Sequence, residues 1–216
     1  MDTNKLIENL ASEAKPVKRI LPLPARVVLW SLFAIVIIAS WIPILGGLRY
    51  DLSTVIIKPR FIIESALLLI AAFTATYTTF RLSYPDIKIE RNTRNLIILS
   101  SLIWAGVNIH ILFGCTHETL SRAANAPNLI NHCLVDLSTM IILPASLLFY
   151  LIWKSSSVRP KWAGYTAMIA ATSIGALGMR YLCPVDESAH LLLWHFLPVI
   201  GFAGLGIILG RLILKW

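Results

Sequence analysis

Long apolar runs are the feature that most constrains how this chain folds. Six segments of about 20 mostly apolar residues are each long enough to cross the hydrocarbon core of a bilayer as a helix. They cover residues 27–48, 61–80, 96–113, 134–153, 162–182 and 189–212. Charged residues make up only 14% of the chain, against about 25% in soluble domains. The sequence therefore predicts an all-α fold, a polytopic membrane bundle of six transmembrane helices, and excludes an ordinary soluble enzyme.

The Lys and Arg residues between these segments predict the orientation of the bundle. Of the 19 basic residues, 5 fall in one set of loops, namely Arg49, Lys58, Arg60, Arg122 and Arg180. The other 14 lie in the opposite loops and near the two termini. Because cytoplasmic loops carry the excess of Lys and Arg, we expect both termini in the cytoplasm. The chain then divides into a cytoplasmic tail, residues 1–26, and a transmembrane domain, residues 27–216, surrounded by the lipid bilayer.

Residues 3–14 of the tail predict a short amphipathic helix. Leu6, Ile7, Leu10, Ala11 and Ala14 recur at helical spacing along one face, and polar residues take the other face. A helix of about 12 residues is marginal alone in water, so its apolar face requires a partner. That partner is either the surface of the bilayer or bundle, or a groove on another cytoplasmic protein. The spacing alone does not separate these two readings.

All cysteines and histidines are predicted to lie on the side of the membrane opposite the termini. They are Cys115, Cys133, Cys183, His110, His117, His132, His190 and His195. A polar pocket is predicted in the same leaflet from Glu64, Asn108, Asp136, Arg180 and Asp186. Carboxylates within a membrane face the bundle interior by default. They indicate either structural ion pairs, for example of Glu64 with Arg60 or Arg180, or a pocket that senses protons or a ligand.

Three uses of the cysteines remain open from the residues alone. Cys and His together suit zinc or another soft metal, with His190, His195, His132, His110 and Cys115 as candidate contacts, although no metal-binding spacing is present. A disulfide is also consistent with the oxidising outer side of a bacterial inner membrane, and Cys133 with Cys183 is the favoured pair. The third reading is inert buried thiols. No cofactor is required by any motif in the sequence.

The motif search predicts no catalytic residues and no direct binding of nucleic acid. The chain lacks a phosphate-binding loop, a dinucleotide fingerprint and an HExxH zinc motif. A membrane thiol-redox enzyme, or a metal or haem enzyme that uses the outer Cys and His residues, is the alternative to a regulator. A transporter is disfavoured because the inner half of the predicted spans offers only hydroxyl groups. Gly201, Gly204, Gly206 and Gly210 suit close helix packing, so a homo-oligomer is also consistent with the sequence.

One stretch resembles a known family. The pattern Cys183-Pro184-x-Asp186-x3-His190-x3-Trp194-His195-x2-Pro198 is similar to a signature of the NrsF-like membrane proteins, which are negative regulators (anti-sigma factors) of extracytoplasmic-function sigma factors. The resemblance extends to Leu6-Ile7-x2-Leu10 in the tail, Pro22-x-Pro24-x-Arg26, Phe61-x2-Glu64, Cys133 and Gly210-Arg211. Cys115 matches no position of this pattern.

The resemblance implies a six-span protein of the bacterial inner membrane whose N-terminal tail holds a sigma factor inactive. It assigns sigma-factor binding to the apolar face of the tail, through Leu6, Ile7, Leu10 and Ala14. It also implies that Cys133 and Cys183, on the outer side, sense a stress such as a heavy metal or an oxidant. The role it implies is signal transduction in a stress response rather than catalysis.

Overall fold

The computed structural model describes residues 3–12, 21–84, 91–125, 127–155, 157 and 159–214. Within these ranges the chain is helical apart from turns and loops, and it contains no strand. The helices are α1 (Thr3–Ser12), α2 (Leu23–Ile44), α3 (Leu52–Val55), α4 (Pro59–Leu82), α5 (Arg91–Leu112), α6 (His117–Ala124), α7 (Pro127–Trp153), α8 (Pro160–Leu182), α9 (Ser188–His190), the π-helix η1 (Leu191–Phe196) and α10 (Leu197–Ile213). The predicted all-α class is confirmed.

Five helices of the described chain are long and apolar enough to cross a membrane. They are α2, α4, α5, residues His132–Trp153 of α7, and the continuous run Ser188–Ile213 formed by α9, η1 and α10. Each corresponds to a predicted apolar segment, with ends that differ by a few residues. The first begins at Leu23 instead of residue 27, because prolines are well suited to the first helical turn and Pro24 starts α2 early. The sixth expected segment, 162–182, forms α8 but is not among these five, so the six-span count and the orientation stay predictions.

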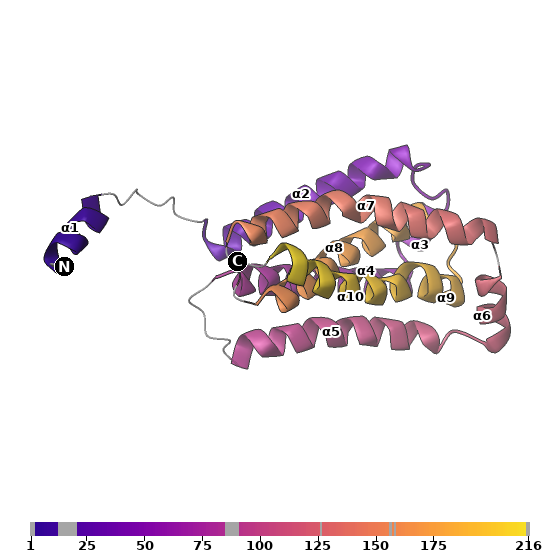
Figure 1. The fold of residues 1–216 in the computed structure, drawn as a ribbon. Coiled ribbons are helices and arrows are strands. Elements are labelled where there is room, and N and C mark those ends of the chain that lie inside the picture. The colour runs from indigo at the N-terminus through magenta and orange to yellow at the C-terminus, as the bar shows by residue number, and fades with distance from the viewer. Residues whose placement is uncertain are drawn as a thin grey trace.

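α8 occupies the middle of the bundle. It packs against α10, α4, α7 and α2 (Figure 1), and its buried positions are mostly small or hydroxyl-bearing residues such as Ala167, Ala171, Thr172 and Gly175. A helix that is surrounded by other helices makes little contact with lipid and does not need large apolar side chains. Small residues instead let its neighbours approach closely. The central position therefore explains why α8 is less apolar than the helices around it.

The closest helix contact joins α8 to α10. A Cβ atom on Gly164 would overlap the backbone of Gly206 and Gly210, and a Cβ on Gly206 would overlap the Gly164 carbonyl. The two backbones thus touch where all three residues lack a side chain. Gly201 and Gly204, on the same helix, have open space where a Cβ would lie. Of the four glycines expected on one packing surface, Gly206 and Gly210 pack against α8, whereas Gly201 is exposed and Gly204 is half-buried.

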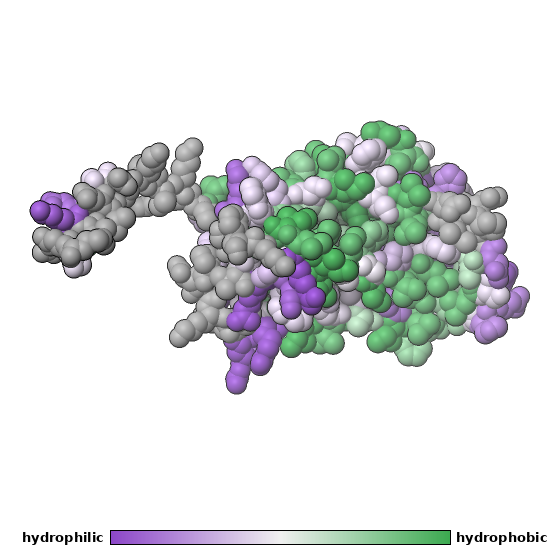
Figure 2. All heavy atoms as spheres, viewed as in Figure 1, coloured by the Kyte–Doolittle hydropathy of each residue, from purple (hydrophilic) through white to green (hydrophobic). Residues whose placement is uncertain are grey.

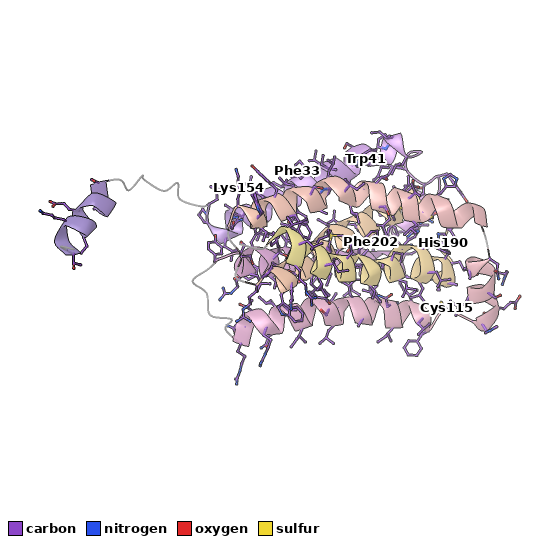
Figure 3. All side chains as sticks on the ribbon, in the orientation of Figure 1. Phe33, Trp41, Cys115, Lys154, His190 and Phe202 are labelled. Atoms are coloured by element: carbon purple, nitrogen blue, oxygen red, sulfur yellow. The ribbon has the colours of Figure 1, made fainter. Side chains whose placement is uncertain are left out.

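The surface of the bundle is divided into bands. Figure 2 shows apolar residues over the middle of the bundle and hydrophilic residues gathered toward its two ends. Large apolar side chains such as Val36, Ile142 and Leu212 are more than half exposed. His190 and Cys115 lie toward one end of the bundle and Lys154 lies at the other (Figure 3). This is the surface expected of a membrane protein, whose exposed middle band contacts lipid.

The tail contains a short helix, α1 (Thr3–Ser12), inside the range predicted for it, and residues 13 and 14 lie outside the described residues. The exposed fraction of Ile7, on the apolar face, is 59%, and α1 stands apart from the bundle in Figure 1. The predictions for Ala14 and for the side chains of Leu6 and Leu10 lie outside what the structure describes. Two further short helices, α3 and α6, were not predicted, because four and eight residues are too few to show a periodic pattern.

We predict that Gly206→Leu destabilises the protein by at least about 1–3 kcal/mol, the usual cost of overpacking a dense interior. The matched control is Gly204→Leu, two residues away on the same helix, where the space for a Cβ is open. Thermal unfolding of the purified protein in detergent measures both changes. Equal unfolding temperatures for the two variants would show that the contact between α8 and α10 is not as close as described.

Candidate functional site

Four cysteine and histidine residues from three parts of the chain meet inside one end of the bundle. Cys133 lies near the beginning of α7, and Cys183 directly follows the end of α8. His190 ends α9 and His195 lies in η1. All four residues are buried. We refer to Cys133, Cys183, His190 and His195 as the Cys–His cluster.

The reactive atoms of the cluster are close enough to act together. One ligand atom from each of the four residues lies within 4.8 Å of the other three. The two Sγ atoms are 3.9 Å apart, and Nε2 of His190 is 3.5 Å from each of them. The His190 and His195 rings meet edge to face at 5.1 Å between centroids. Both cysteines are free thiols, so the site as described is a reduced dithiol flanked by two imidazoles.

The π-helix is what brings the two histidines together. Residues five apart in an α-helix lie about 140° apart around its axis, so His190 and His195 would face different neighbours. A π-helix bonds residue i to residue i+5, and here the N–H of Leu197 donates to the carbonyl of Leu192. Pro198 has no N–H, and its ring would clash with the carbonyl of residue 194 in a regular α-helix. The wider π turn before Pro198 removes this clash and places both imidazoles on the side of the cysteines.

His195 is the least satisfied member of the cluster. Its side chain is fully buried, and neither Nδ1 nor Nε2 has a hydrogen-bond partner among the described residues. A buried polar group without a partner is costly, by about 1–3 kcal/mol, and such groups in native proteins usually have a role. The unpartnered nitrogens therefore make the cluster a candidate ligand site.

Other predicted site residues lie outside the cluster. Cys115 is half-buried and donates a long hydrogen bond of 3.5 Å to the carbonyl of Ile111, and burial raises the pKa of its thiol. His110 is exposed. Asn108 donates to the carbonyl of Trp104 and borders a separate apolar cavity between α5 and α10. His132 and Asp136 join Cys133 and Cys183 around a cavity of about 470 Å³ that leads to the cluster.

A chain of alternating charges lies beside the cluster and includes three of the five predicted polar-pocket residues. Glu64 is fully buried and pairs with Arg60 at 2.8 Å and with Arg180 at 3.1 Å. Arg180 also pairs with Asp186 at 2.7 Å. Asp186 continues the chain to Arg49, which pairs with Asp51. Glu64 and Arg180 thus form the structural ion pair that was one of the two predictions from the sequence. Asp136 and Asn108 belong neither to this chain of ion pairs nor to the Cys–His cluster.

The ion pairs keep the loop groups of this network charged. Burial opposes the ionisation of Asp186, but the hydrogen bond and charge of Arg180 and the charge of Arg49 outweigh it and lower the pKa of Asp186. The hydrogen bond from Arg49 lowers the pKa of Asp51, and the same bond raises the pKa of Arg49. The charged network therefore persists at neutral pH and holds the loop that carries Cys183.

A comparison with protein-family models identifies the family. The model described as "negative regulator of sigma F" (NrsF) matches residues 10–216, nearly the whole chain. The chain belongs to the NrsF family. No curated protein and no solved structure matches it. Family membership makes this chain a negative regulator of the anti-sigma class and gives it a sigma factor as partner.

At the end of the bundle opposite the cluster, the NrsF-family chain buries a further arginine, Arg26, which in the sequence is only one position of the Pro22-x-Pro24-x-Arg26 pattern. Arg26, in the first turn of α2, donates hydrogen bonds to Ser83 Oγ, the Leu151 carbonyl and Ser155 Oγ. Its guanidinium also lies 4.4 Å from the centre of the Phe80 ring. Arg26 thus fastens the helix that follows the tail to the ends of α4 and α7. Arg49 was likewise missed, and the signal for it was its place among the few basic residues of the outer loops.

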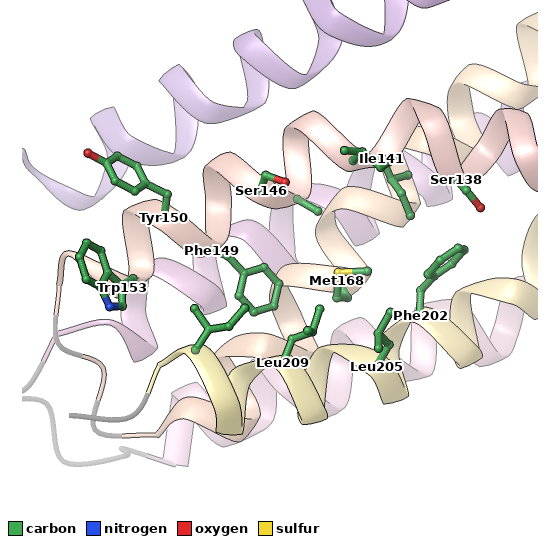
Figure 4. Close-up of a pocket in the computed structure, with 13 residues that line it drawn as sticks. Ser138, Ile141, Ser146, Phe149, Tyr150, Trp153, Met168, Phe202, Leu205 and Leu209 are labelled. Atoms are coloured by element: carbon green, nitrogen blue, oxygen red, sulfur yellow. The ribbon is translucent and has the colours of Figure 1, made fainter.

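An apolar groove of about 530 Å³ between α7 and α10 is a less suitable functional site for an NrsF protein. Figure 4 shows Phe149, Met168, Phe202 and Leu209 lining it, with the hydroxyls of Ser138 and Ser146 as polar groups. Tyr150 also lines the groove, but the described lining contains no carboxylate, imidazole, thiol or basic group. In a bilayer, acyl chains fill such a groove, so the Cys–His cluster remains the candidate site with side chains that can react or bind a metal.

We predict that Arg180→Met destabilises the protein by about 3–5 kcal/mol, because it leaves the buried Glu64 carboxylate without its inner partner. Arg122→Met is the matched control, since Arg122 pairs with Glu118 on the exposed surface and such pairs contribute about 0–1 kcal/mol. Thermal unfolding in detergent compares the two variants. A loss no larger for Arg180→Met than for Arg122→Met would mean that the buried network does not hold this end of the bundle.

Proposed function

We propose that this protein is an anti-sigma factor of the bacterial inner membrane that responds to stress outside the cytoplasm. Its tail holds an extracytoplasmic-function sigma factor inactive, and Cys133 and Cys183 trigger release when they react with a heavy metal or an oxidant. The observation that carries this proposal is the meeting of the two thiols, 3.9 Å apart, inside a buried cluster. Membership of the NrsF family supports the regulatory role.

The proposed topology has six spans and two cytoplasmic termini. α8 has 23 residues, and at about 1.5 Å per residue it is long enough for a core of about 30 Å. Its lower hydropathy follows from its position inside the bundle rather than from exposure to water. The start of α2 and the end of α10 lie at the same end of the bundle (Figure 1), which agrees with an even number of spans. The 14 basic residues of that side support its cytoplasmic location.

The tail is the proposed surface for the sigma factor. α1 offers an apolar face that includes the exposed Ile7, together with Leu6, Leu10 and Ala14 from the sequence pattern. An amphipathic helix that docks in a groove of its partner uses this arrangement of side chains. The length of the tail favours such a partner, because a free helix of this size is unstable in water. Binding would then both order the tail and occupy a surface of the sigma factor.

The dithiol can react in two ways. An oxidant that accepts two electrons and two protons joins the two sulfur atoms, which must approach from 3.9 Å to a bond length of about 2.05 Å. A metal ion instead binds both thiolates and displaces their protons. Disulfide formation draws the beginning of α7 toward the end of α8, whereas a metal ion links these two helices and η1 at nearly their present spacing. Oxidation is thereby converted into a change in the relative position of two helices, and metal binding into a new link between them.

α7 is the element that connects this reaction to the tail. Cys133 and Leu151 are 18 residues apart on α7, which corresponds to about 27 Å along a helix. The Leu151 carbonyl accepts a hydrogen bond from Arg26 at the beginning of α2, and the tail precedes α2 directly. A shift of α7 at the cluster therefore acts on the contact between Leu151 and Arg26, where the tail joins the bundle.

We predict that Ile7→Asp reduces capture of the sigma factor at least tenfold, because the substitution places a charge on the apolar face of α1. Lys5→Ala changes an exposed residue of the polar face of the same helix and is the control. The assay is co-purification from native membranes with quantification of the sigma factor by mass spectrometry, and a chain lacking residues 1–20 defines the background. If that truncated chain still captures the sigma factor, binding does not occur through the tail.

We predict that the double variant Cys133→Ser, Cys183→Ser still holds the sigma factor but no longer releases it under stress. Cys115→Ser is the control, because this thiol lies outside the cluster. The measurement is the fraction of sigma factor that stays with the membranes after addition of cadmium or of a thiol oxidant. Normal release from the double variant would contradict the proposed sensing role.

A further inference from the structure

We propose that the Cys–His cluster is a four-coordinate site for a thiophilic divalent cation of the zinc group, Zn²⁺ or Cd²⁺. The ligands are Sγ of Cys133 and Cys183 and one imidazole nitrogen each of His190 and His195. As the trigger for release, this site rests on the proposed function. As a binding site, it depends only on the geometry of the four side chains.

The distances within the cluster match the edges of a tetrahedral site. Zinc lies about 2.3 Å from cysteine sulfur and about 2.0–2.1 Å from histidine nitrogen. Tetrahedral angles then separate two sulfur ligands by about 3.8 Å, and a sulfur from a nitrogen by about 3.6 Å. The cluster has 3.9 Å between the two Sγ atoms and 3.5 Å from each Sγ to His190 Nε2. Three of the six edges are thus already at the spacing that the ion requires.

His195 separates this proposal from a site that only forms a disulfide. A disulfide would use the two sulfur atoms and leave both nitrogens of His195 buried without a partner, as they are in the described structure. A metal ion takes one of these nitrogens as its fourth ligand. The π turn also relieves the clash at Pro198, but without a ligand the imidazole that it turns toward the two thiols gains no hydrogen bond. The two histidines are therefore part of the site rather than its surroundings.

The charges also balance. Two thiolates and two neutral imidazoles around a divalent cation give a site without net charge, which can be buried at a far lower cost than an isolated ion. The donor set of sulfur and nitrogen favours zinc-group ions over Mg²⁺ or Ca²⁺, which prefer oxygen. Because all four positions come from the protein, the site resembles structural zinc sites, which are closed, and not catalytic ones, which keep a position open.

A path into the site is present. The cavity of about 470 Å³ beside Cys133 and Cys183 has His132 and Asp136 among its lining residues. One wall of this cavity is the turn at Gly46 and Gly47. The φ angles of these two residues are 129° and 89°, a backbone conformation that favours glycine over residues with a side chain. His132 is exposed and Asp136 is half-buried, so a cation meets an imidazole and a carboxyl group before it reaches the thiols.

The test is titration of the reduced, full-length protein in detergent with Cd²⁺, followed by the thiolate-to-cadmium absorption in the near ultraviolet. We expect one ion per chain, displaced by excess Zn²⁺. His195→Asn should bind at least 100-fold more weakly, because loss of even the outer hydrogen-bond partners of metal ligands costs about 10–100-fold. Cys115→Ser and His110→Asn, which change residues outside the cluster and its cavity, are the matched controls and should bind as the wild type does.

Each result decides the proposal. Wild-type affinity in His195→Asn, or absorption that persists when Cys133 and Cys183 are both serine, would overturn it. If His195→Asn does not fold, X-ray absorption of the zinc-loaded wild type serves instead, and any set other than two sulfur and two nitrogen neighbours rejects the site. No sigma factor is present in these assays, so they are independent of the release assay described under Proposed function. Metal binding here without release in that assay would refute only the proposed function. Release in that assay without metal binding here would refute only the metal site.

Discussion

The contact between α8 and α10 determines where the parts of the Cys–His cluster can lie. Gly164 meets Gly206 and Gly210 backbone to backbone, which brings the two helices closer than any larger residue would allow. Cys183 follows the far end of α8, and His195 lies in the π turn that leads into α10. The contact near one end of the two helices therefore limits the distance between thiol and imidazole near the other. The candidate site thus depends in part on residues that have no functional groups.

The buried charges have a complementary role. Buried ion pairs contribute little net stability, since the cost of removing two charges from water offsets their attraction, yet breaking one is expensive. Here Arg180 holds Glu64 on α4 and Asp186 on the loop after α8, and Asp186 also contacts Arg49. The loop that carries Cys183 is therefore fixed by polar contacts. The contribution of these charges is to define the position of the loop.

Much of the fold follows from the sequence because its causes are local. Apolar runs of bilayer length predict helices, and the shared side of all cysteines and histidines predicts where they gather. The convergence of His190 and His195 could not be predicted, because it depends on a π turn, and Pro198 can also be accommodated in a membrane helix without one. The contacts of Arg49 with Asp186 and of Arg26 with Leu151 were equally hidden, since each joins residues more than 100 positions apart. The central place of α8 is a property of the whole bundle, which no single segment encodes.

A signal that crosses this bundle needs an element with two discrete arrangements. A stimulus shifts such an equilibrium only by its difference in affinity for the two states, and about 3 kcal/mol changes the ratio of the states roughly a hundredfold. The surroundings of Arg26 suit this requirement. A buried guanidinium that donates to Leu151, Ser83 and Ser155 cannot lose these acceptors gradually, because each intermediate leaves a charged donor unpaired in an apolar interior. A displacement of α7 would accordingly be tolerated up to a threshold and then release α2 as a unit, so the tail would switch between holding and releasing its partner rather than loosen in proportion to the stimulus.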